Sequence, residues 1–69
     1  MELSNQDKRA LLESNIFYFG ERIFQTQMQI QVAKASNNPE SIAANESVLA
    51  ELLLTIKVYQ DELAKLETE

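Results

Sequence analysis

The sequence of 69 residues contains no cysteine and no histidine, and it has a single glycine and a single proline. Without cysteine, the chain forms neither a disulfide bond nor a zinc site built on thiolates. Without histidine, it lacks the commonest metal ligand and the usual general base near neutral pH. One glycine and one proline are too few for the many turns of an all-β fold. These absences leave a helical protein held together by packing alone.

The length and charge of the chain restrict its class further. A chain of this length makes one domain, residues 1–69, with a marginal core, so we expect oligomerisation or a partner protein to supply stability. Apolar residues make up 45% and charged residues 25%, as in folded domains. The net charge of −5 argues against direct binding to nucleic acid or to anionic lipid. Neither a secretory signal nor a membrane-spanning stretch is recognisable, so the expected location is the cytoplasm, of a bacterium or of a virus-infected cell.

Turn signals divide the chain once, around residues 36–38. Asn38 is a good N-cap and Pro39 suits the first position of a helix. Ser4 provides an earlier N-cap, with Asp7 three residues later. We therefore predict helices over about 5–36 and 39–67. Residues 23–32 alternate apolar and polar side chains, which is also the pattern of a strand, but no turn residue bounds them and glutamine favours helix.

Both predicted helices carry an apolar residue every three or four positions over about four heptads, which is typical of helices that pair along a seam. Folding the chain back at the turn makes the two seams antiparallel, with Phe19 expected opposite Ile56 and Ile16 opposite Tyr59. Thr26 and Asn45 interrupt the seams with polar side chains. The sequence thus predicts an all-α, coiled-coil-like two-helix hairpin. Its predicted core consists of Leu12, Ile16, Phe19, Ile23, Ile30, Ile42, Leu49, Leu52, Ile56, Tyr59 and Leu63.

A second set of apolar residues remains after the seam is assigned. At about 100° per residue, most of those in the first helix point almost opposite to the seam. Because a two-helix hairpin buries one face of each helix, this surface predicts an interface. Pairing of two hairpins into a four-helix bundle, as a homodimer or tetramer, is the favoured interpretation, and docking on another protein is the alternative. The predicted partner or oligomer interface consists of Phe17, Tyr18, Phe24, Met28, Val32, Leu54 and Val58.

The side chains that are present do not suggest catalysis. The carboxylates of both helices fall on solvent-facing positions, inward Glu-x-x-His pairs are absent, and no glycine-rich phosphate loop occurs. We expect no enzyme, cofactor, metal or small-molecule substrate. The predicted function is a non-enzymatic protein–protein interaction module of the adaptor, assembly or co-chaperone type. The alternative is a small acidic inhibitor, of the kind phages and plasmids encode, that blocks a host enzyme or a nucleic-acid-binding surface.

Overall fold

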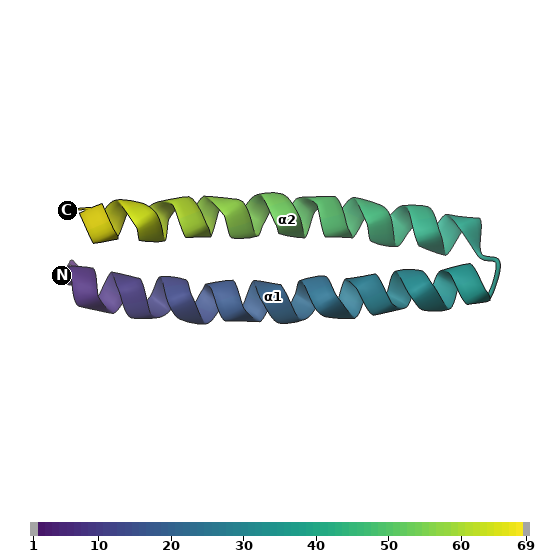
Figure 1. Ribbon diagram of the computed structural model, residues 1–69, viewed down its shortest axis with the longest axis horizontal. Coiled ribbons are helices and arrows are strands. Elements are labelled where there is room, and N and C mark those ends of the chain that lie inside the picture. Colours follow the sequence, from purple (N-terminus) through teal and green to yellow (C-terminus); the bar gives the residue numbers. More distant parts are fainter. Residues whose placement is uncertain (1, 69) are drawn as a thin grey trace.

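Two long helices, antiparallel and joined by a tight turn, make up nearly the whole molecule. The computed structural model describes residues 2–68, so Met1 and Glu69 of the predicted domain lie outside the described part. Helix α1 spans Asn5–Ala35 and helix α2 spans Pro39–Thr68. The first and last described residues lie at the same end of the hairpin (Figure 1). The predicted all-α hairpin is confirmed, and residues 23–32 are helical throughout.

The ends of the helices follow from local hydrogen bonds. The Ser4 hydroxyl accepts from the Asp7 amide at 3.1 Å, which satisfies one of the free N–H groups that open α1. At the other end, Asn37 adopts a left-handed conformation with φ 52°. The Asn37 amide donates to the Lys34 carbonyl at 3.1 Å, and the Asn38 amide donates to the Ala33 carbonyl at 3.0 Å. This pair of bonds is a Schellman motif, which stops α1 and reverses the chain.

Asn38 then starts the second helix. Its side-chain oxygen accepts from the Ser41 amide at 3.1 Å, and its own carbonyl accepts from the Ile42 amide at 3.0 Å. Pro39 occupies the first helical position, where its lack of an N–H group leaves no bond unmade. Two adjacent asparagines therefore end one helix and begin the next, which accounts for the shortness of the turn.

Within residues 2–68, the seam between the helices is the only core. Thr26, Ile30, Ala33 and Leu52 are buried, and no described side chain is completely enclosed. The Phe19 ring packs edge-on against Tyr59 with centroids 5.0 Å apart, one layer from the Ile56 partner that counting predicted. The remaining seam residues are half-buried: Leu12, Ile16, Ile23, Ile42, Asn45, Leu49, Ile56, Leu63 and Leu66, together with Phe19 and Tyr59.

The two polar seam residues are satisfied within their own helices. The Thr26 hydroxyl donates to the Arg22 carbonyl at 2.8 Å. The Asn45 amide nitrogen donates to the Ser41 carbonyl at 2.9 Å and lies 3.3 Å from the Ser41 hydroxyl. Since these bonds stay inside one turn of helix, neither residue fixes the register between α1 and α2.

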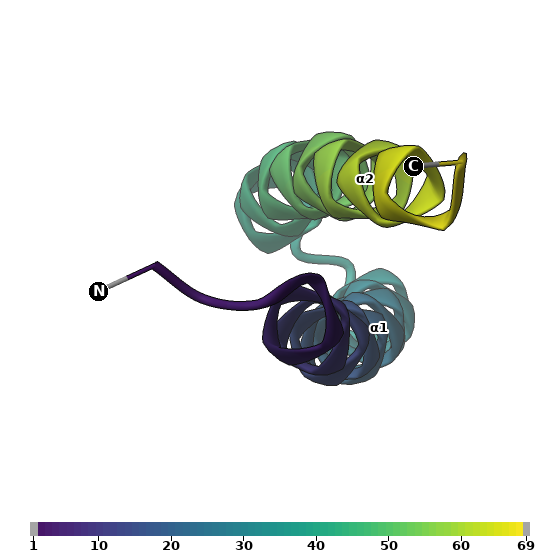
Figure 2. The same ribbon diagram turned by 90° about the vertical axis from the view of Figure 1, so that its left-hand side faces the viewer.

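The hairpin is elongated rather than globular. It measures 49 × 20 × 14 Å, and its radius of gyration is 15.7 Å. A compact domain of this length has a radius of gyration of about 11 Å. Viewed along the helices, α1 and α2 form a single layer, so each has a face turned away from the other (Figure 2). Side chains on these two outer faces are exposed.

Candidate interaction surface

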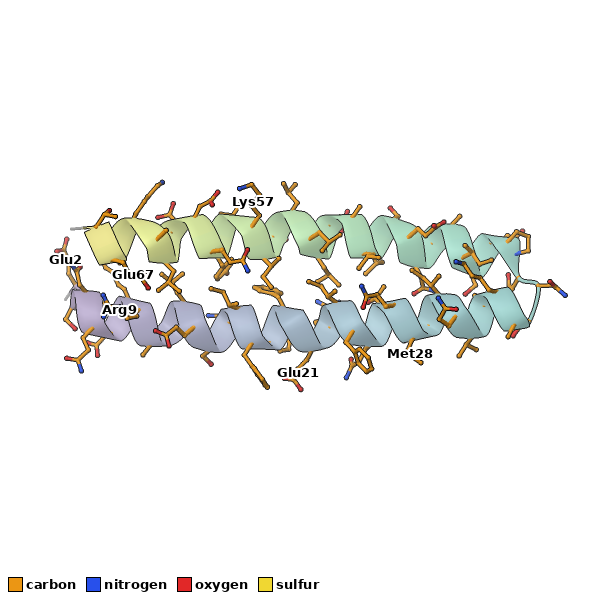
Figure 3. The ribbon with its side chains drawn as sticks, viewed as in Figure 1. Glu2, Arg9, Glu21, Met28, Lys57 and Glu67 are labelled. Carbon is orange, nitrogen blue, oxygen red and sulfur yellow. The ribbon has the colours of Figure 1, made fainter. Side chains whose placement is uncertain are left out.

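The side of α1 that faces away from α2 carries a stripe of exposed apolar residues. Figure 3 shows Glu21 and Met28 pointing outward from this side. The side chains of Phe17, Val32 and Phe24 are 71%, 63% and 62% exposed. These are larger exposed fractions than those of the seam residues, although the side chains are as apolar. We call this surface the outer stripe, and it comprises Ala10, Phe17, Phe24, Met28, Val32 and Ala35.

The stripe is wider around its aromatic residues because Leu11 and Tyr18 extend it along one flank. Tyr18 is half exposed, and its ring meets the Phe19 ring edge-on at 5.5 Å between centroids. The Arg22 guanidinium lies 6.0 Å from the centre of the Tyr18 ring, at the limit of a cation–π contact. Tyr18 is thereby held between the seam and the outer surface of α1.

Helix α2 has a smaller apolar patch on its own outer face. Leu54 is 67% exposed and Val58 is about half exposed, with Leu53 beside them. The surrounding α2 positions alternate with charged residues such as Glu51 and Lys57, both exposed. Of the residues predicted as an interface, the structure thus places Phe17, Tyr18, Phe24, Met28 and Val32 on one helix, and Leu54 and Val58 on the other.

Charged residues gather toward the open end of the hairpin and are absent from the part of α1 between the middle of the outer stripe and the turn. From Ile23 to Ala33, α1 carries no charged residue. Two ion pairs occur among the described residues, Lys57–Asp61 at 3.3 Å and Lys65–Glu62 at 3.1 Å, and both lie within α2. Lys8 and Glu62 line the same hollow at the open end, but no ion pair among residues 2–68 joins α1 to α2.

The surface hollows lie at the two ends of the hairpin and do not assemble a set of reactive groups. The hollow at the open end has a volume of about 440 Å³. Its lining consists of Leu3, Lys8, Leu11, Leu12, Glu62, Lys65 and Leu66. The sequence interpretation overlooked Leu3, which is half exposed; its position just before the N-cap, where apolar residues often pack on a helix, is the signal that points to it. Within residues 2–68, no three acidic side chains come close enough to share a metal ion.

Neither α1 nor α2 contains a stretch apolar enough, over a sufficient length, to cross a membrane. Comparisons of the chain with protein-family models, with curated proteins and with solved structures found no match.

Proposed function

We propose that this chain is a non-enzymatic protein–protein interaction module, in which the outer stripe of α1 is covered by a second protein surface. We further propose that two copies of the hairpin pair into a four-helix assembly. The observation that carries both statements is the exposure of Phe17, Phe24 and Val32, the most exposed large apolar side chains on the outer face of α1. Covering each such side chain stabilises an assembly by about 1.5–3 kcal/mol.

The total surface of the hairpin supports pairing. Its accessible surface is 5323 Å². A globular monomer of the same mass, 7.9 kDa, exposes about 4400 Å². The excess of roughly 900 Å² is close to the ~800 Å² that each partner contributes to a stable interface of standard size. A second hairpin on the outer stripe would therefore bring the surface of each chain to that of a compact protein.

The molar mass in solution tests this proposal. We expect light scattering on a sizing column to give twice the chain mass of 7.9 kDa over a range of concentrations. Phe24→Glu places a charge in the middle of the stripe and should yield a monomer. Gln60→Glu adds the same charge at an exposed position of α2 and should leave the dimer intact.

Two results would contradict the proposal. One is a wild-type chain that remains monomeric at the highest concentration. The other is a Phe24→Glu variant that associates as tightly as the Gln60→Glu control. Helical circular dichroism recorded on each variant separates a loss of association from a loss of folding.

A further inference from the structure

Two pairs of residues in the outer stripe match each other when a second copy of α1 is turned end for end. Its small residues, Ala10 and Ala35, lie at the two ends, and its large residues, Phe17, Phe24 and Met28, lie between them. Turning a second α1 end for end sets Ala10 opposite Ala35 and Phe17 opposite Met28. Both pairs share one midpoint, between Arg22 and Ile23. A methionine sulfur against an aromatic ring is a favourable contact.

Residues on the two flanks of the stripe fit the same arrangement. Glu13 and Lys34 are three heptads apart, which puts them on the same flank of α1, and both are exposed. In the antiparallel arrangement, Glu13 of one copy lies two residues, about 3 Å along the helix axis, from Lys34 of the other, twice by symmetry. On the opposite flank, the exposed residues Leu11 and Val32 are also three heptads apart and meet in the same way.

The parallel arrangement lacks these features. It would set Glu21 directly opposite Glu21 of the second copy, where two like charges repel, whereas the antiparallel arrangement offsets the two carboxylates by three residues, about 4.5 Å along the helix axis. It would also keep Glu13 and Lys34 about 32 Å apart along the helix axis, at the ~1.5 Å rise of each residue. The charges of α1 therefore distinguish the two directions.

We infer that the occupant of the outer stripe is the α1 helix of a second copy, packed antiparallel about a two-fold axis near Arg22 and Ile23. This inference rests on the proposed function. Because the stripe lies opposite the seam, the two α1 helices are innermost and the two α2 helices lie outside them. The patch around Leu54 and Val58 remains on the outer surface of this assembly.

Cysteine cross-linking tests the direction, because the chain has no cysteine of its own. We expect Ala10→Cys and Ala35→Cys to form no cross-linked dimer when each is oxidised alone. A mixture of the two should form one readily. Gln60→Cys, at an exposed position of α2, serves as the control for disulfides made by random collision, and it should stay uncross-linked in the same conditions.

A charge exchange provides a second test. Glu13→Lys should raise the dissociation constant of the dimer by about five-fold, because it sets two lysines together in each symmetric pair. Combining it with Lys34→Glu in one chain should restore the affinity.

The possible failures are distinct. If the single variants cross-link by themselves, the helices are parallel, and the inference is wrong while the dimer stands. If the protein is dimeric by light scattering but even the mixture stays uncross-linked, the dimer uses another face and the inference is again wrong. If the protein is monomeric, the proposed function fails as well.

Discussion

At the scale of single residues, Gly20 is the least explained position in α1. A Cβ atom added there would meet nothing within 4 Å, and its φ is not positive, so the hairpin itself does not require glycine. Gly20→Ala should raise the free energy of unfolding by about 0.5–1 kcal/mol, because alanine is the better helix former. Urea denaturation at a fixed protein concentration measures the change. A decrease instead would show that some other surface approaches the backbone at this position.

Asn45 offers a second test at the same scale. An asparagine in a helical seam can be buried and fix the register between the helices, or it can lie near the turn with its amide in water. Its bonds to Ser41 show that it does not reach across to α1.

Asn45→Leu should therefore stabilise the hairpin by about 1 kcal/mol, since an apolar side chain replaces a polar one in the seam and no partner is left unsatisfied. The melting temperature and the molar mass should be recorded together. A change of mass would mean that the asparagine does select the number of partners.

At the scale of the helices, the two asparagines of the turn have different roles. Asn38→Ala removes the side-chain acceptor of the Ser41 amide and should cost about 1 kcal/mol of stability. Asn38→Asp keeps an acceptor at the same place and should unfold like the original protein. Denaturant titration of the two variants side by side checks the role of the cap. Equal losses in both would indicate that the turn depends on something other than this hydrogen bond.

The helices were predictable from sequence because every local signal agreed. The caps at Ser4 and Asn38, the proline at the first position of α2 and the unbroken heptads all indicate the same boundaries, and the observed helices begin and end within a residue of them. The residue of α2 that packs against the Phe19 ring was less predictable from the sequence. Counting heptads aligns two antiparallel helices to within about one heptad layer, and the contact between the Phe19 and Tyr59 rings lies within that margin.

The exposure of the outer stripe also followed from the helical period, since a residue opposite the seam of a two-helix hairpin has nothing to pack against. What covers the stripe did not follow from the period alone. The proposal that a second copy covers it needed the surface area of the folded chain and the positions of Glu13 and Lys34 relative to the stripe.

At the scale of the whole molecule, the hairpin has a thin core and a large surface. Among the described residues its seam buries four side chains and encloses none completely, and its shape exposes roughly 900 Å² more than a compact protein of its mass. Association with a second chain stabilises the folded state of a protein with so thin a core. The melting temperature of a dimer therefore depends on protein concentration. The assembly inferred above therefore links folding to pairing.

Glu21 is a charged residue on the same face of α1 as the outer stripe. The proposed pairing makes a specific prediction about it. In the antiparallel assembly it faces Phe24 of the second copy, so its carboxylate loses water without gaining an opposite charge. Glu21→Gln should lower the dissociation constant of the dimer several-fold, measured by sedimentation equilibrium. Removing any acid also reduces the repulsion between two chains that each carry a net charge of −5. Glu46→Gln, on the exposed side of α2, measures this general effect. A gain confined to Glu21→Gln would place the carboxylate in the interface, whereas equal gains in both variants would place it in solvent and contradict pairing through the outer stripe.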